Sequence, residues 1–452
     1  MKTKFRLDKS NKEFQHALSI INETNKNLFL TGKAGTGKTT LLKLIKEKSK
    51  KKMIIVAPTG VAAINAGGVT IHSFFKIPFT AFHPNDYRLQ TDKFVKESNI
   101  YQTFYYNEDK VQIIETLELL IIDEVSMVRC DILDVIDAIL RSFRDCDKPF
   151  GGVQVLMIGD VYQLSPIVKD NDWEILKNHY KSKYFFSSKV LEKSEYEYVE
   201  LTKIYRQKDL EFIDLLNAVR VNSLNSKQLI VLNSKYSSAI QDDFNKYILL
   251  ATHNKQVDEI NQRELDKING KEFCYYAEIQ GKIDVGNIVA PELLLLKVGA
   301  RVMFLKNDNT SNQFYNGKLG NVIELEDDKI IVKCDDGLEV EVEKMYWENQ
   351  EYSFDDKKSK VNQNTIGTFL QYPLKLAWAI TIHKSQGLTF DNVIADLGNS
   401  FAMGQVYVAL SRCTSFEGII LKSRISWSNF SISNSIVEFE KERKKLLKEK
   451  SY

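Results

Sequence analysis

Long hydrophobic runs and an apolar leader are both missing from this chain of 452 residues. Its longest apolar stretches, such as residues 119–122, are far too short to span a bilayer. The charged opening, residues 1–10, is followed by no signal-peptide core. These absences predict a cytoplasmic protein, and scarce proline with abundant lysine, asparagine and isoleucine favours a bacterial source.

Cysteine is scarce as well, with five scattered residues and no Cys-x-x-Cys spacing. Such a set argues against a disulfide framework and against a cysteine zinc site. Neither sign of charge dominates, because 62 basic residues face 60 acidic ones and the net charge is +2. This balance leaves nucleic-acid binding open, since a basic groove can be offset by acidic surface elsewhere.

Buried-strand patterns occur in two blocks, near residues 25–200 and 200–425, and the length itself predicts about two to four modules. The apolar runs are residues 27–30, 53–57, 119–122, 153–158, 247–251 and 393–396. Helical patterns separate them, so the sequence predicts an α/β fold with two parallel sheets.

Two stretches break this alternation. Residues 76–112 are rich in aromatic and charged side chains and are predicted to be an insertion in the first block. Residues 299–366 have short alternating strands with turns at Asn316-Gly317 and Asp335-Asp336-Gly337, which predicts a small inserted β-barrel. Residues 10–27 predict an amphipathic helix, and the last twenty residues a charged, solvated one.

The strongest chemical signal is the segment 32–39, GKAGTGKT, between a predicted strand and a predicted helix. Its glycines let backbone N–H groups wrap phosphates, and a helix N-terminus adds positive potential. We expect Lys38 to reach the β- and γ-phosphates of ATP and Thr39 to hold Mg²⁺. The alternative to a phosphate-binding loop is a glycine-rich turn that matches the motif by chance. The expected nucleotide-binding residues are Gly32, Ala34, Gly35, Thr36, Gly37, Lys38, Thr39 and Thr40.

Further candidates for catalysis follow predicted strands. Asp123 is expected to order Mg²⁺ and Glu124 to polarise the attacking water. Gln163 is placed to sense the γ-phosphate, although an amide that merely hydrogen-bonds its own loop fits equally well. Arg206 and Arg412 in the second block are candidates for stabilising the phosphoryl charge, the alternative being surface salt bridges.

Small hydroxyl, amide and imidazole groups recur near predicted strand ends in both blocks. Such groups suit phosphate contacts, and Phe74 is a candidate for stacking on a base. A lone His-Ser pair would be read as a helix cap or a core histidine, but matching groups in both blocks favour a nucleic-acid track. The candidates are Pro58, Thr59, Gly60, His72, Ser73, Phe74, Thr252, His253, Asn254, Thr381, His383, Lys384 and Ser385.

Taken in order, these motifs resemble those of superfamily 1 helicases of the 5′-to-3′ class, and more narrowly the petite-integration-frequency helicase family, with RecD-like helicases as relatives. The resemblance covers roughly residues 10–425. It also rests on APTGVAA at 57–63, LTKIYRQ at 201–207, TIHKSQGLT at 381–389 and VYVALSR at 406–412. The segment 131–152 resembles the signature of the family, and Gln15 matches a glutamine that reads adenine in similar helicases.

The resemblance implies two RecA-like domains with ATP and Mg²⁺ between them and single-stranded DNA across their tops. The implied parts are a first domain (1–75 and 113–195), a wedge insertion (76–112), a second domain (196–298 and 367–430), an SH3-like insertion (299–366) and a C-terminal helix (431–452). The terminal regions that some relatives use for targeting or partners are not expected here.

The implied activity is ATP-dependent 5′-to-3′ unwinding of duplex DNA by a monomer, in replication, repair, recombination and telomere maintenance. G-quadruplexes and RNA–DNA hybrids are further substrates that the family makes plausible.

Two other classes fit the phosphate-binding loop alone. A nucleotide switch that binds nucleic acid or protein without unwinding needs no second block carrying Arg206 and Arg412. A small-molecule kinase fits Asp123, Glu124 and Gln163 poorly and would not need a chain of this length. A helicase is therefore the predicted function.

Overall fold

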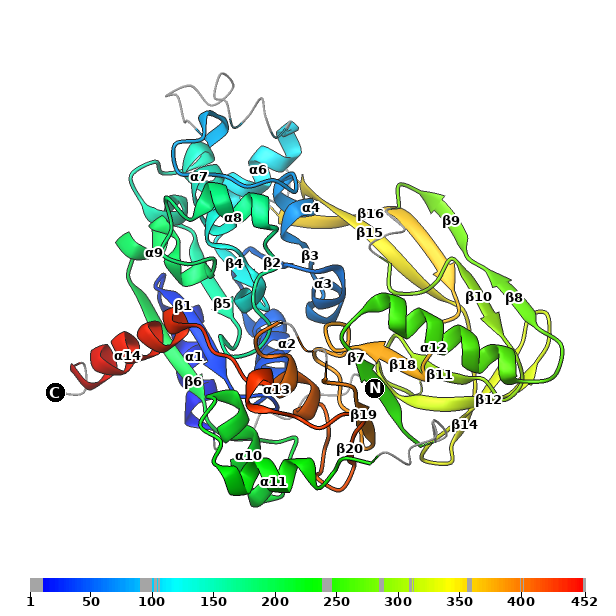
Figure 1. Ribbon diagram of the computed structural model, residues 1–452. Helices are drawn as coiled ribbons and strands as arrows, with labels where there is room; N and C mark the ends of the chain where they lie inside the picture. The colour runs from blue at the N-terminus through cyan, green and yellow to red at the C-terminus, as the bar shows by residue number, and fades with distance from the viewer. Residues whose placement is uncertain are drawn as a thin grey trace. The chain divides into compact units, whose positions relative to one another are not determined.

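The structure is a computed structural model in which residues 11–89, 100, 104, 106–237, 246–283, 288–308, 311, 313–355, 360–398, 400 and 402–449 are described (Figure 1). The chain divides into two compact units. The first comprises Phe5–Tyr205, Tyr352–Gln363 and Ile432–Tyr452, and the second comprises Met1–Lys4, Arg206–Glu351 and Asn364–Ser431. In the described part, no helix has the length and apolar character needed to cross a membrane.

The first unit is built on a six-stranded parallel sheet in the order β3-β2-β4-β5-β1-β6. The strands are β1 (Asn27–Gly32), β2 (Met53–Ala57), β3 (Val69–Thr70), β4 (Leu119–Ile122), β5 (Gln154–Ile158) and β6 (Tyr196–Leu201). Every residue of β4 and β5 is buried. Burial on both faces explains why these strands read as continuous apolar runs, and it confirms the predicted parallel sheet.

Helices cover this sheet and connect its strands (Figure 1). They are α1 (Lys12–Glu23), α2 (Lys38–Lys48), α3 (Gly60–Ala66), α4 (Ile71–Phe75), α6 (Glu108–Thr116), α7 (Cys130–Phe143), α8 (Asp170–Leu176) and α9 (Lys189–Lys193). Short 3₁₀ turns are η1 (Tyr87–Leu89), η3 (Val125–Met127), η4 (Pro149–Gly152) and η5 (Phe185–Ser187). The predicted N-terminal helix is confirmed, since α1 buries Phe14, Ala17 and Ile21 in one core with β1 and α2.

Strand β6 lies inside the first sheet rather than in the second block. It pairs with β1 along its whole length, from Asn27 opposite Tyr196 to Gly32 opposite Leu201. The first unit therefore extends past the expected boundary at residue 195. Only Val199 and Leu201 of this strand are buried, a pattern typical of the edge of a sheet, which made it hard to assign from sequence.

The second unit has its own parallel sheet, in the order β18-β7-β19-β20. Its strands are β7 (Ile248–Ala251), β18 (Ala379–Thr381), β19 (Val393–Ala395) and β20 (Ile419–Leu421). The helical elements are α10 (Leu210–Arg220), α11 (Ser226–Asn233), α12 (Asn254–Lys267), α13 (Gln405–Leu410) and η7 (Trp427–Asn429). The prediction of two separate parallel α/β blocks is thus confirmed.

Three antiparallel sheets are also described here; they belong to the second unit except for Tyr352–Gln363, at the ends of β15 and β16, which count with the first. One sheet has the order β14-β13-β12-β11-β17, a second β15-β16-β9, and a third pairs β10 with β8. The bounds are β8 (Phe273–Tyr276), β9 (Glu278–Gly281), β10 (Leu293–Leu296), β11 (Arg301–Phe304), β12 (Leu319–Leu325), β13 (Ile330–Cys334), β14 (Glu339–Glu341), β15 (Met345–Asp355), β16 (Lys360–Gln371) and β17 (Leu374–Leu376). The antiparallel part therefore extends beyond the expected 299–366 at both ends.

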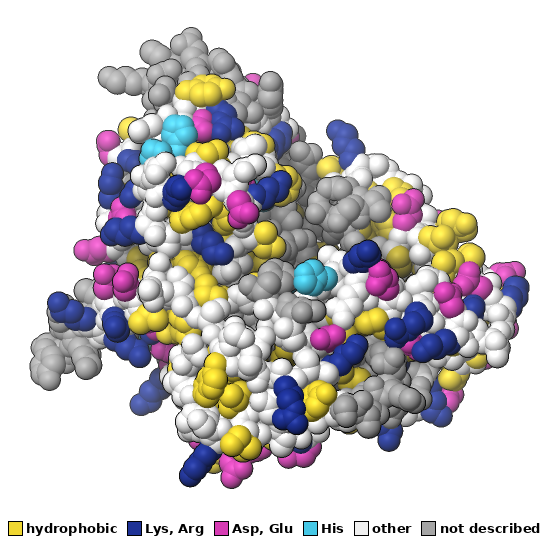
Figure 2. All heavy atoms as spheres, viewed as in Figure 1, with side chains coloured by type: hydrophobic (Ala, Val, Ile, Leu, Met, Phe, Trp, Pro, Cys, Tyr) yellow, Lys and Arg dark blue, Asp and Glu magenta, His cyan; other side chains and the backbone are white. Residues whose placement is uncertain are grey.

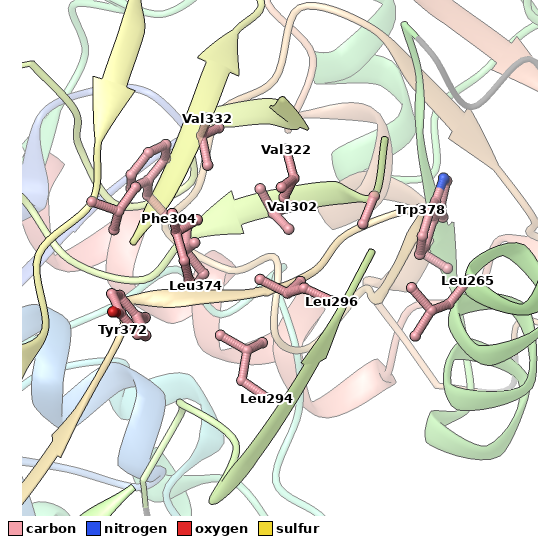
Figure 3. Close-up of a cluster of buried hydrophobic side chains, with 14 of the residues drawn as sticks. Leu265, Leu294, Leu296, Val302, Phe304, Val322, Val332, Tyr372, Leu374 and Trp378 are labelled. Atoms are coloured by element: carbon pink, nitrogen blue, oxygen red, sulfur yellow. The ribbon is translucent and has the colours of Figure 1, made fainter. Parts of the chain in front are cut away.

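A single hydrophobic core joins the antiparallel strands to the parallel sheet of this unit. Val302, Phe304 and Leu374 lie in it beside Leu294 and Leu296 of β10 (Figure 3). The same cluster includes Leu249 of β7, Ile394 of β19 and Leu265 of α12. This shared core fixes β17 and the strand that follows it, β18, against α12.

The C-terminal helix α14 (Asn434–Glu449) is not the solvated helix that its charge predicts. Ile436 is buried, and the ring of Phe439 stacks on Phe186 with the centroids 4.3 Å apart and the planes 7° from parallel. Arg443 pairs with Glu200 of β6 at 3.5 Å. Positions 436, 439 and 443 share one helix face, so α14 packs on the first unit with that narrow stripe.

Basic and acidic side chains are interspersed over the face of the molecule drawn in Figure 2, as the near-zero net charge predicts.

Candidate functional site

Three loops of the first unit meet at one edge of its sheet. Strands β4, β5 and β1 are neighbours, with Ile122 opposite Met157 and Leu30 opposite Ile158. Parallel strands end at the same edge, and ligands of such sheets bind there. The loops after β1, β4 and β5 carry the predicted phosphate-binding, acidic and glutamine motifs, so the fold brings all three together.

The loop after β1 has a backbone that requires glycine. Gly32, Gly35 and Gly37 have φ angles of 156°, 78° and 90°. A Cβ on Gly32 would lie 2.6 Å from the hydroxyl oxygen of Thr36 and 2.8 Å from the carbonyl oxygen of Leu201. Gly37 caps α2, so the first N–H groups of that helix point out at the end of the loop. This is the geometry that binds phosphates.

Lys38 is held over the loop by main-chain carbonyls. Its Nζ donates to the oxygens of Gly32 at 2.5 Å and Lys33 at 3.1 Å. Its positive charge also acts to lower the pKa of Asp123. The next two residues, Thr39 and Thr40, are exposed in the first turn of α2, whereas Ala34 and Thr36 are buried inside the loop.

Asp123 and Glu124 lie side by side after β4. Burial, reinforced by the charge of Glu124, raises the pKa of the Asp123 carboxyl to about 7. The Glu124 N–H donates to Asp123 Oδ1 at 3.0 Å. Glu124 itself is left-handed, with φ 50° and ψ 43°, a conformation that costs a non-glycine residue of order 1 kcal/mol. Strain and crowded carboxylates at one spot indicate a functional site that favours a cation.

Asp123 and Glu124 could bind a divalent ion only if further ligands completed its coordination. Within the described residues there is no group of three or more His, Cys, Asp and Glu side chains that could hold a metal. Mg²⁺ is commonly bound through one or two protein groups, with water and substrate phosphates completing its octahedron. The sparse donor set of Thr39 and Asp123 fits that mode.

Gln163 is anchored to its own loop. Its Nε2 donates to Asp160 Oδ2 at 3.4 Å, and its main-chain N–H donates to the Asp160 carbonyl at 2.9 Å. Both residues are buried. These hydrogen bonds match the alternative to phosphate sensing, an amide that holds its own loop. The loop lies at the same edge of the sheet as the other two.

Arg206 and Arg412 are brought together within the second unit by Ser411. Arg206 Nη1 donates to the Ser411 carbonyl at 2.9 Å, and Arg412 Nη2 donates to the Ser411 hydroxyl at 3.1 Å. Burial and the neighbouring charge of Arg412 lower the pKa of Arg206 to about 9. Two guanidinium groups that repel each other in a buried place would be stabilised by an anion.

One side of the phosphate-binding loop is lined by aromatic side chains that the sequence analysis did not single out. The Tyr205 N–H donates to the Gly35 carbonyl at 2.8 Å, and the Tyr205 hydroxyl accepts from Asn11 Nδ2 at 3.1 Å. Its ring is 42% exposed and lies 6.5 Å from that of Phe14. Gln15, exposed on α1, follows Phe14 directly. The sequence offered a signal for Tyr205, since this residue directly precedes Arg206 in one of the motifs.

Phe74, which the sequence predicts to stack on a base, has a buried ring in this structure. Its ring is 1% exposed and packs beneath the ammonium of Lys110, 3.6 Å from the ring centroid. Position 74 falls on the inner face of α4, with Phe75. The exposed ring of this region is Phe79, 83% exposed and 4.2 Å from the imidazole of His72. Phe79 replaces Phe74 as the stacking candidate.

The other first-unit candidates differ in their contacts and exposure. Thr59 caps α3 by accepting the N–H of Ala62, so its hydroxyl holds the helix start. His72 donates from Nδ1 to the Ile77 carbonyl at 2.9 Å, and burial lowers its pKa. Ser73 is exposed, and Pro58 and Gly60 are partly exposed.

Some of the second-unit candidates are buried and others are exposed. Ser385 is fully buried and its hydroxyl donates to the Ile382 carbonyl at 2.7 Å, so this hydroxyl shapes the loop and is not presented to a ligand in this structure. Thr381 accepts the N–H of Lys384 at 3.2 Å and shapes the same loop. His383 is partly exposed, with a pKa lowered by burial, and Lys384 is exposed.

The loop after β7 presents a second exposed group. His253 and Asn254 are exposed at the start of α12, and Thr252 is buried with its hydroxyl oxygen 2.7 Å from His253 Nδ1. His253, Asn254, His383 and Lys384 are therefore the members of the predicted set that can reach a ligand from this unit.

Comparison with known proteins gives matches to one family. A family model described as PIF1-like helicase matches residues 6–229. The chain is 32% identical to the ATP-dependent DNA helicase Pif1 of Campylobacter jejuni, over 92% of this chain and 94% of the relative. It is 33% identical to human ATP-dependent DNA helicase PIF1 over 87% of this chain, but spans only 58% of the human protein.

Solved structures give the same result. The Bacteroides Pif1 structure in complex with ADP-AlF4 is 42% identical, with a TM-score of 0.86 over 96% of this chain and 97% of that chain. The structure of Bacteroides Pif1 in complex with ADP-AlF3 and single-stranded DNA is 43% identical, with a TM-score of 0.68 over 96% of this chain and 97% of that one.

Proposed function

Because this chain belongs to the PIF1-like helicase family and is an ATP-dependent DNA helicase, we propose that it moves 5′-to-3′ along single-stranded DNA and unwinds the duplex ahead of it. The observation that carries the proposal is the meeting of three loops at one edge of the first sheet, together with the paired guanidinium groups of the second unit.

The first unit supplies the hydrolysis chemistry in this proposal. Backbone N–H groups of the loop 32–39 bind the phosphates of ATP, and Lys38 leaves its carbonyl partners to reach the β- and γ-phosphates. Thr39 and Asp123 hold Mg²⁺, which neutralises charge on the phosphates when bound. Glu124 takes a proton from the attacking water, and Gln163 reports the γ-phosphate to its loop through Asp160.

The second unit supplies the charge that completes the reaction. Arg206 and Arg412 stabilise the charge that develops on the transferred phosphoryl group, the role of arginine fingers. Their mutual repulsion makes an anion between them favourable, which is the physical reason for proposing this role.

The adenine of ATP packs against Tyr205 in this proposal. An exposed ring fixed to the phosphate-binding loop through Gly35 is a suitable stacking surface for a base. Gln15 is the hydrogen-bonding partner proposed for the base edge, from its exposed position on α1.

The DNA track runs over the exposed groups of both units. Phe79, supported by His72, stacks on a base, and Pro58, Gly60 and Ser73 approach the backbone nearby. In the second unit, His253, Asn254, His383 and Lys384 contact phosphates.

The proposal also assigns the parts of the chain. The two units are RecA-like domains, residues 76–112 act as a wedge that splits the duplex, and the antiparallel region around 299–366 is an SH3-like insertion. Part of the wedge falls outside the described residues. G-quadruplexes and RNA–DNA hybrids are further proposed substrates, and a monomer the proposed active form.

Unwinding of duplexes with a single-stranded tail at one end tests the proposal. A duplex with a 5′ tail should be unwound in the presence of ATP and Mg²⁺, and one with a 3′ tail should not. The Glu124→Gln variant should bind both substrates and unwind neither. Unwinding from the 3′ tail would contradict the proposed polarity, and binding without any unwinding would leave a translocase.

A further inference from the structure

A cavity of about 550 Å³ lies within the second unit, beside the loop that carries Lys384. Its walls come from α12, from residues 288–295, and from β17 and β18. Two lysines line it, Lys375 and Lys384. Lys375 has no part in the function proposed above.

The strand geometry turns Lys375 away from the core. On β17, Leu374 pairs with Phe304 and Lys375 pairs with Met303. Leu374 is fully buried and is labelled in the core of Figure 3. Successive side chains of a strand point to opposite faces, so Lys375 lies on the cavity side.

The electrostatics of Lys375 are unfavourable to its charge. Burial, and then the positive charge of Lys384, lower its pKa to about 7. Two acids, Asp258 of α12 and Glu292, also line the cavity, but the neighbouring charge that acts on Lys375 is the cation. The other titratable group nearby in the chain, His383, has its own pKa lowered by burial.

Three other partly or fully buried lysines of this unit have acceptors. Lys318 pairs with Asp336 at 2.8 Å, Lys297 donates to the Ile268 carbonyl at 3.1 Å, and Lys306 donates to the Tyr346 carbonyl. No described residue accepts a hydrogen bond from the Lys375 ammonium or pairs with it. Lys375 is partly buried, and its ammonium faces the cavity without a protein acceptor among the described residues, so the position suits an anionic ligand.

We propose that Lys375 and Lys384 bind a phosphate group of the single-stranded DNA backbone at this cavity, which makes Lys375 a DNA-binding residue. The inference rests on the proposed path of DNA over the loop of His383 and Lys384. That loop is continuous with the cavity wall, and the backbone of the translocated strand is the polyanion that the helicase activity brings to it.

The salt dependence of DNA binding tests this site. The affinity of the full-length protein for a fluorescent oligothymidine is measured over a range of salt concentrations. Loss of one phosphate contact to a single strand reduces the slope of log affinity against log salt by about 0.7. Lys375→Met should show this reduction and Lys375→Arg should not. Lys333→Gln, which removes an exposed lysine paired with Glu339, is the matched control and should leave the slope unchanged.

Two further readouts separate a binding role from a structural one. Lys375→Met keeps the aliphatic stem and removes a charge that has no partner among the described residues, so its melting temperature should equal or exceed that of the wild type. Binding of phosphate favours the protonated ammonium, so the wild type should take up a fraction of a proton with DNA near pH 7.5. Calorimetry in two buffers of different ionisation enthalpy measures this uptake, which Lys375→Met should lack.

The outcomes are distinguishable. If Lys384→Gln lowers the slope and Lys375→Met does not, the site is wrong while the DNA path stands. If neither lowers it, the proposed path over this loop fails as well. If inorganic pyrophosphate binds the wild type and not Lys375→Met, and the DNA slope is unchanged, the cavity takes a free phosphate ligand and the assignment to DNA is overturned.

Discussion

At the scale of single residues, the clearest prediction concerns Lys38. Its ammonium rests on two loop carbonyls, within the electrostatic reach of Asp123. Lys38→Ala should lower ATP turnover by about 10²–10³-fold, the usual cost of removing one group that stabilises transition-state charge. DNA binding should change little. Lys48→Ala, at the exposed end of the same helix, is the control, and undiminished turnover in Lys38→Ala would overturn the phosphate assignment.

Tyr205 gives a second residue-scale prediction. Its ring stacks on the adenine in our proposal, so Tyr205→Ala should raise the KM for ATP by about 5–100-fold, the equivalent of about 1–3 kcal/mol of stacking. Tyr205→Phe keeps the ring and loses only the hydrogen bond from Asn11, so its KM should stay within a few-fold of wild type. Steady-state kinetics with ATP measures both. A similar loss in Tyr205→Phe would show that the hydroxyl matters more than the ring.

At the scale of elements, an ion-pair network ties the start of α7 to the segment that carries Phe79. Arg129 donates to Asp131 Oδ2 at 2.6 Å and to the Thr80 carbonyl at 2.7 Å. Asp131, fully buried, accepts the N–H of Phe82 at 3.0 Å. Only η3 separates this network from Asp123 and Glu124, so it connects the acidic loop to the proposed base-stacking ring.

Arg129→Gln should therefore displace Phe79 and raise the DNA concentration for half-maximal stimulation of ATP hydrolysis by about tenfold. The maximal rate should change less. Because coupled residues are not additive, Arg129→Gln should add little to Phe79→Ala in a double-mutant cycle. Arg141→Gln removes an ion pair elsewhere on α7 and is the control. Full additivity of the two losses would show that Arg129 does not act through Phe79.

The C-terminal helix makes a prediction about stability at the same scale. Phe439 stacks on Phe186, so Phe439→Ala should lower the free energy of unfolding by about 2 kcal/mol, below the cost of a fully buried phenylalanine. Val437→Ala, on the exposed side of α14, should cost less than half as much. Urea denaturation of both variants measures the difference. Equal effects would mean that α14 is the solvated helix that its charge suggests.

The features that depend on local periodicity and motif spacing, namely the strands and the loops that follow them, could be predicted from the sequence. The strands that begin and end the phosphate-binding unit were found because buried parallel strands are continuously apolar, and their order along the chain located the three loops. What failed depended on which way a side chain points. Phe74 and Ser385 have the right chemistry but face the core, while Phe79 and Lys375, which we propose as ligand contacts, were not among the predicted site residues.

At the scale of the whole molecule, the proposed motor requires both units. The acids and the phosphate-binding loop belong to the first unit, and Arg206 with Arg412 belongs to the second. DNA-contacting groups are proposed on both, so a strand bound across them should alter the hydrolysis of ATP. A nucleotide switch confined to the first unit would not require this dependence.

The most direct measurement of that claim is steady-state ATP hydrolysis by the full-length chain with and without single-stranded oligothymidine. We predict stimulation of at least about tenfold at saturating DNA, with little stimulation remaining in Arg412→Ala. A rate that is the same with and without DNA would contradict the coupling of the two units and the motor that we propose.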